Sequence, residues 1–129
     1  MKFKKILILI PILLICGVMY MSIFRADNKE PIGKFSLNEY QYFIENFPSD
    51  KVLGNISNAS KAKEEAEKVW IEIYGEDVKK DIKPYVVMYD ETSKTWLVTG
   101  TLPKNMLGGV PNIIIQGNNG KVLAVWHDK

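Results

Sequence analysis

Hydrophobic and polar residues divide the chain into an uncharged N-terminal run and a patterned remainder. Residues 6–24 contain no charged side chain, and Lys2, Lys4 and Lys5 precede them. As a helix this run would be about 28 Å long, close to the thickness of the hydrocarbon core of a bilayer. The pattern therefore predicts a transmembrane helix, with residues 1–24 as a membrane anchor or uncleaved signal.

Two other fates of this segment stay open. Signal cleavage needs small residues at the −1 and −3 positions, and a site after Ala26 would place Phe24 at −3. Lipidation would use Cys16, but the bulky Ile15 precedes it. Neither fits as well as an uncleaved anchor.

Flanking charges predict the orientation of the anchor. Three lysines precede the span, whereas Arg25 and Lys29 follow it, so the N-terminus is expected in the cytoplasm. Residues 25–35, with Pro31 and Gly33, then form a tether. We expect a single-pass protein of the cell membrane with an extracytoplasmic domain over residues 36–129.

The first helix of this domain is expected over residues 37–47. Ser36 and Glu39 fit a capping box, Phe35 and Tyr40 fit a hydrophobic staple, and Pro48 ends the helix. Its apolar positions recur at helical spacing, which indicates core packing.

The second helix is expected over residues 59–74. Ala62, Ala66 and Trp70 belong to its apolar stripe, opposite a run of lysine and glutamate that reads as a solvated face. Asn58 or Ser60 is placed to cap its start. Gly75 follows as the residue that ends it in a left-handed conformation.

The C-terminal half contains four strand-like runs joined by turns. The turn at 90–94 and the Asn-Gly turn at 118–120 predict two hairpins, and a longer loop spans residues 103–110. We predict an α+β fold in which the two helices pack on one face of a curved, four-stranded antiparallel sheet. The predicted strands are 84–89, 95–102, 111–116 and 121–127.

Strand alternation predicts which residues face the helices. Gly100 interrupts the second strand, which indicates a bulge, a bend or the close passage of another element. No inward position that we assign is titratable. The inward positions are Trp96, Val98, Leu102, Ile113, Ile115, Val122 and Ala124.

Charge and candidate chemistry exclude several functions. The chain has 17 Lys and Arg against 15 Asp and Glu; without the three lysines before the anchor the count is 14 against 15, a net charge of −1. A nearly neutral domain lacks the basic face that binds nucleic acid. The single cysteine, Cys16, lies in the anchor, and the single histidine, His127, has no metal-ligand partners at a suitable spacing. We expect no disulfide in the exported domain, no metal, no cofactor and no enzyme activity.

The order of motifs after residue 58 resembles a known family. Tyr74-Gly75, Lys83-Pro84-Tyr85, the run 96–103 (WLVTGTLP), the run 108–111 (GGVP) and the run 127–129 (HDK) stand in the order found in bacterial immunity proteins of nuclear transport factor 2 fold. The resemblance covers residues 59–129 and implies a cone-like sheet. The motif residues look structural: Trp70, Gly75, Pro84, Tyr85, Trp96, Gly100, Pro103, Gly108, Gly109 and Pro111.

This resemblance implies a protein of a polymorphic toxin system that binds and neutralises a cognate toxin without catalysis. Two alternatives are an envelope ligand-binding or accessory module and, less favoured, a small isomerase-like enzyme. Whether the domain forms a homodimer through its sheet stays open. The loop and turn residues that we expect to contact the partner are Lys104, Asn105, Met106, Leu107, Asn118, Asn119, Trp126 and His127.

Overall fold

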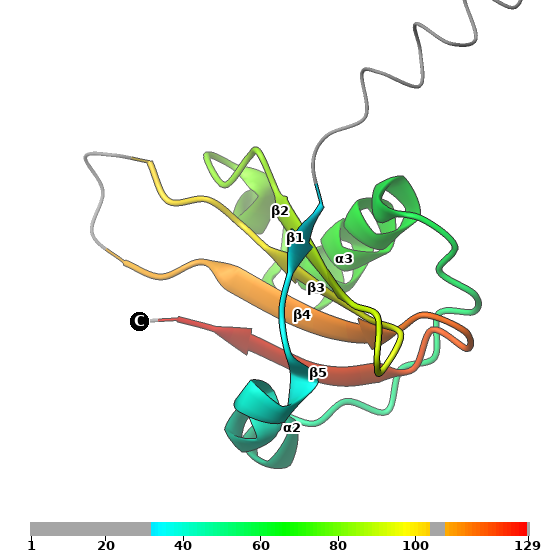
Figure 1. Cartoon of the computed structure of the whole chain (residues 1–129). Coiled ribbons are helices and arrows are strands. Elements are labelled where there is room, and N and C mark those ends of the chain that lie inside the picture. The colour runs from blue at the N-terminus through cyan, green and yellow to red at the C-terminus, as the bar shows by residue number, and fades with distance from the viewer. Residues whose placement is uncertain (1–31, 104–107, 129) are drawn as a thin grey trace, which may run out of the picture. The chain divides into compact units, whose positions relative to one another are not determined.

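The computed structural model describes residues 32–103 and 108–128 (Figure 1). The predicted anchor, residues 6–24, and most of the predicted tether lie outside these ranges. Within them, no helix has the length and apolar character needed to cross a membrane.

A five-stranded sheet organises the domain, with the strands in the order β1-β2-β3-β4-β5. Neighbours from β2 to β5 are antiparallel, as predicted, whereas β1 pairs with β2 in parallel. The strands are β1 (Gly33–Lys34), β2 (Val86–Asp90), β3 (Thr95–Thr99), β4 (Pro111–Gln116) and β5 (Val122–His127).

The predicted count of four strands was therefore wrong, because a fifth strand, β1, joins the four antiparallel ones. Gly33 and Lys34, which fall in the predicted tether, form the fifth strand. A strand of two residues is too short to show the alternation by which strands are predicted. A Cβ on Gly33 would lie 2.9 Å from Met88 Cγ, so glycine lets β1 approach β2 closely.

The second predicted helix is confirmed as α3 (Ala59–Tyr74). Asn58 caps it by accepting a hydrogen bond of 2.8 Å from the Lys61 amide. Gly75 follows with a φ of +93°, and its amide donates to the Ile71 carbonyl at 2.8 Å. Positive φ at this point suits glycine, which lacks a Cβ.

The first predicted helix consists of a 3₁₀ turn, η1 (Leu37–Tyr40), and a short α-helix, α2 (Gln41–Asn46). The Ser36 side chain does not cap it. Instead, the Leu37 amide donates to Asp90 Oδ2 at 2.9 Å, and this bond, with those from Ser93 and Thr92, lowers the pKa of Asp90. The predicted staple is confirmed, because the rings of Phe35 and Tyr40 meet edge to face at 5.6 Å.

Helices cover both faces of the sheet, which corrects the prediction that they share one face. Trp96, Val98 and Ile113 pack in the core on the α3 side. Leu97, Ile114, Ala124 and Trp126 form a second core with η1 and α2, and α2 lies beside β5 (Figure 1). The unbroken apolar run from Ile113 to Ile115 is typical of a strand buried on both sides.

A bulge in β5 moves one predicted inward residue to the other face. Ile114 pairs with Ala124, but Ile115 pairs with Val122, so the register shifts by one residue. Ala124 therefore packs on the α2 side, whereas Val122 packs on the α3 side.

The end of β3 also differs from its prediction. The strand stops at Thr99, and Leu102, predicted to face inward, is 38% exposed. Gly100 is buried, and a Cβ there would lie 3.1 Å from Pro111 Cδ and 3.2 Å from Ile82 Cβ. Of the three roles that the sequence left open for this glycine, the contacts with Pro111 and Ile82 show the close passage of another element.

Residues 47–53 run along the outer edge of β5. The amides of Val125 and Val122 donate to the carbonyls of Phe47 and Lys51, at 3.1 and 2.9 Å. The Leu53 amide donates to the Gly120 carbonyl at 2.9 Å. These bonds occupy part of the strand edge, which protects it against pairing with a second chain.

Gly54 and Gly120 pack backbone against backbone where this segment meets the β4–β5 turn. Gly120 has a φ of +71°, and a Cβ there would lie 2.0 Å from the Gly54 carbonyl oxygen. Gly54 has a φ of +81°, but its own Cβ would meet nothing within 4 Å.

These two glycines offer a matched test of the packing. Gly54→Ala should cost only the strain of positive φ, about 1–2 kcal/mol of unfolding free energy. Gly120→Ala should add roughly 1–3 kcal/mol, because the new methyl group overlaps the Gly54 backbone. Urea unfolding followed by tryptophan fluorescence measures both, and equal losses would contradict this packing.

Candidate partner-binding surface

The predicted contact residues fall at opposite ends of the sheet. Asn118 and Asn119 are exposed in the β4–β5 turn, whereas His127 ends β5. Six residues of strand separate these ends by about 20 Å. Lys104, Asn105, Met106 and Leu107 lie outside the described residues. The structure therefore does not gather the described members into one site.

Trp126, also expected at the surface, is a core residue. Its side chain is 5% exposed and stacks on Phe43 with ring centroids 4.2 Å apart. His127 is exposed, and its ring contacts that of Tyr74 edge to face at 5.6 Å. Of these two neighbours, only His127 can meet a partner through its side chain.

Asn112 is the centre of a polar network that the sequence analysis missed. Thr99 Oγ1 donates to Asn112 Oδ1 at 2.9 Å, and Asn112 Nδ2 lies 3.0 Å from the Val110 carbonyl and 3.2 Å from Asp128 Oδ2. The Trp126 indole donates to Asp128 Oδ1 at 3.1 Å. A lone asparagine inside the apolar run 111–115 was the available signal, because a buried amide needs partners.

The Gly-Gly motif and the chain end meet at this network. A Cβ on Gly109 would lie 1.2 Å from the Asp128 carbonyl oxygen, so only glycine fits there. The Asp128 amide donates to the Val110 carbonyl at 3.1 Å. The motif around Gly109 therefore packs against the last strand and has a structural role.

Other motif residues also have structural contacts. The Trp96 indole donates to the Ile56 carbonyl at 3.1 Å, and the rings of Trp70 and Tyr85 meet edge to face at 5.3 Å. The peptide bond before Pro84 is cis, and Pro111 is buried at the start of β4.

Tyr85 and Glu67 form the most perturbed titratable pair of the described domain. The Tyr85 hydroxyl donates to Glu67 Oε2 at 2.5 Å, and Lys83 Nζ lies 3.5 Å from the same oxygen. Burial and this bond raise the pKa of Tyr85, and the bond lowers the pKa of Glu67. The pair ties α3 to the segment before β2.

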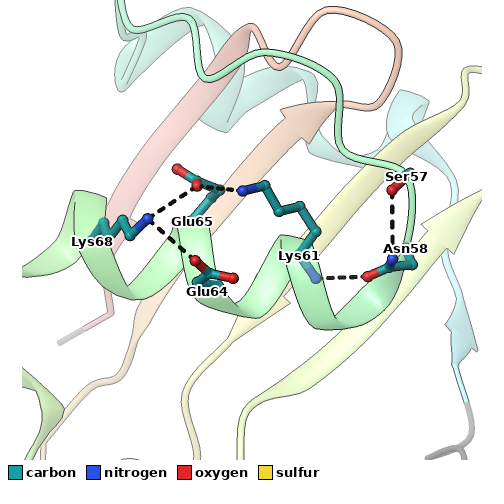
Figure 2. Close-up of polar contacts among 6 residues, drawn as sticks. All are labelled: Ser57, Asn58, Lys61, Glu64, Glu65 and Lys68. Carbon is teal, nitrogen blue, oxygen red and sulfur yellow. Dashed lines mark hydrogen bonds and ion pairs between the residues drawn. The ribbon is translucent and has the colours of Figure 1, made fainter.

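Charged residues on α3 satisfy one another, as Figure 2 shows. Glu65 Oε1 lies 3.1 Å from Lys61 Nζ and 3.4 Å from Lys68 Nζ, and Lys68 also lies 3.3 Å from Glu64. Burial of Glu65 raises its pKa, but the hydrogen bonds from the two lysines outweigh burial and lower it overall. This run was predicted to be a solvated face, and Glu65 departs from that prediction because it is mostly buried.

The alternatives of a ligand module and an enzyme find little support in these positions. Trp70, Trp96 and Val98 fill the α3 side of the sheet and are at most 6% exposed. Asp90 is held by Leu37 and Ser93, and His127 is exposed. Within residues 32–103 and 108–128, no three His, Cys, Asp or Glu residues are grouped to hold a metal ion.

Exposed apolar side chains are the remaining candidates for function. Tyr42, within α2, is 63% exposed, and Phe47, just after α2, is 41% exposed. Ile73 and Tyr74 are exposed at the end of α3, where Tyr74 meets His127. Aromatic side chains left in solvent are typical of protein interfaces.

The fold defines the class as a small α+β domain with a five-stranded sheet. A family model described as NTF2 fold immunity protein matches residues 61–129, more than half of the chain. The chain belongs to this family, which confirms the resemblance seen in the motifs. No curated protein sequence and no solved structure matches the chain.

Removing the Asn112 amide should destabilise the domain. Asn112→Ala leaves Thr99 and Asp128 without a shared partner beside a buried strand, and should cost about 1–3 kcal/mol of unfolding free energy. Asn118→Ala, in an exposed turn, should change the unfolding free energy by less than about 0.5 kcal/mol. Urea unfolding compares the two variants, and similar losses would argue against the network.

The lowered pKa of Glu65 predicts that the domain loses stability as the pH falls. A carboxyl group with a folded pKa below its ordinary value of 4.5 stabilises the fold above that pH. This stabilisation is lost as pH falls through the lowered value. Glu65→Gln should therefore reduce the decline in unfolding free energy between neutral pH and pH values below 4.5; an unchanged decline would refute the coupling.

Proposed function

We propose that this protein is a membrane-anchored immunity protein that binds a cognate bacterial toxin and neutralises it by covering its active surface. Membership of the NTF2 fold immunity protein family carries this proposal. Protection by this route needs a stable, complementary surface and no chemistry of the immunity protein itself.

The arrangement of charges supports binding in preference to catalysis. The perturbed carboxylates of α3 are engaged: Glu65 by lysines, and Glu67 by Lys83 and Tyr85. Asp90 is engaged by backbone and hydroxyl donors. These groups hold elements of the fold together. The exposed aromatic residues, in contrast, contribute little to the core and are available to a partner.

The proposed location follows from the N-terminal sequence. The uncharged run 6–24, with its preceding lysines, would hold the domain at the outer side of the cell membrane. A toxin that arrives from outside the cell would then meet its inhibitor before it reaches the cytoplasm. Anchoring also keeps the inhibitor at a high local concentration near the bilayer.

Co-expression tests this proposal. If the gene next to this one encodes a large secreted protein with a toxic C-terminal domain, that domain, directed outside the cytoplasm, should arrest growth, and the full chain should restore it. The full chain should also copurify with that domain. Growth arrest that persists despite a normal level of the full chain would contradict the proposed function.

A further inference from the structure

α2 carries aromatic residues on both of its sides. Phe43 and Ile44 pack on the second core, where Phe43 stacks on Trp126. Tyr42 lies on the exposed side, and its ring meets that of Phe47 edge to face at 6.5 Å. These two large rings are left in solvent, whereas Phe43 and Ile44 of the same helix pack against the core.

Carboxylates flank these rings in the sequence. From Phe35 to Asp50 the chain contains Glu39, Glu45 and Asp50, all exposed, and no lysine or arginine. The next lysine, Lys51, is paired with Glu72 of α3. We call Tyr42, Glu45, Phe47 and Asp50 the α2 surface: it combines two exposed aromatic rings with local negative charge.

The α2 surface lies outside the part of the chain that the family model matches. That part, residues 61–129, begins within α3 and includes β2 to β5. The earlier segment supplies β1, η1, α2 and the strip along β5. Two of its aromatic side chains remain exposed even though the segment already covers the second core.

From this placement and charge we infer that the α2 surface is where this protein contacts its toxin, and that the toxin presents a positively charged rim around an apolar pocket. The inference rests on the proposed function and names the surface that performs it. Tyr42 and Phe47 would enter the pocket, because aromatic rings bury a large area at a low cost in side-chain entropy. Glu45 and Asp50 would face basic side chains of the rim.

Negative charge argues against two other occupants of this surface. The cytoplasmic membrane carries anionic lipids, which repel a segment with three carboxylates and no base. A second copy related by twofold symmetry would bring the same carboxylates together, which is unfavourable. A basic protein face, in contrast, would be attracted by the carboxylates and would bury the two aromatic rings.

Binding measurements on the full-length protein in detergent test the inference, with the immobilised toxic domain of the neighbouring gene as the probe. Tyr42→Ser with Phe47→Ser should weaken binding at least about 100-fold. Glu45→Lys with Asp50→Lys should slow association by about tenfold or more and reduce its dependence on salt. Matched controls at exposed sites elsewhere, Val86→Ser and Glu91→Lys, should bind like the unaltered protein.

Each outcome bears on the inference. Unchanged affinity of the Tyr42→Ser, Phe47→Ser variant, with an unchanged unfolding midpoint, would overturn it and leave the proposed function standing. If the unaltered protein does not bind the toxic domain, both the inference and the proposed function are overturned. Dimers that this variant dissociates in the absence of toxin would assign the surface to a second copy and overturn the inference. Quenching of a Tyr42→Trp variant by brominated lipids would assign it to the bilayer and overturn it as well.

Discussion

Burial of the central strand on both faces is the constraint on which the rest of this domain depends. Ile113 and Ile115 face α3, and Ile114 between them faces α2, all fully buried. A strand of this kind needs two covers, and a single long helix can supply only one. The N-terminal segment supplies the other, so β1, η1 and α2 are integral to the fold although they precede the matched family region.

Close backbone contacts hold this second cover in place. The strip 47–53 bonds to β5, Gly120 admits the Gly54 carbonyl, and the Leu37 amide bonds to Asp90 at the β2–β3 turn. At the other end of the sheet, Asn112 and Gly109 bring the chain end against the start of β4. The motifs that identify the family therefore have structural roles.

A stable domain with exposed aromatic residues on one segment fits the proposed role of an immunity protein. The perturbed charges of α3 and the polar network of Asn112 are satisfied within the domain and stabilise it. The α2 surface lies on a segment whose inner side packs in the second core and whose outer side is exposed. A rigid support below exposed aromatic rings lowers the entropic cost of binding.

The sequence by itself determined α3, the two hairpins and the family, because each of these rests on local periodicity, turn chemistry or a motif. It left the cap of α3 open between Asn58 and Ser60, and the role of Gly100 open between a bulge, a bend and a close passage. Tertiary structure decided what local patterns do not encode. Strand alternation cannot reveal a bulge, so Ala124 changed faces, and a two-residue strand such as β1 carries no pattern. Which face a helix covers depends on long-range packing, and this placed α2 opposite α3, buried Trp126 and left Tyr42 exposed.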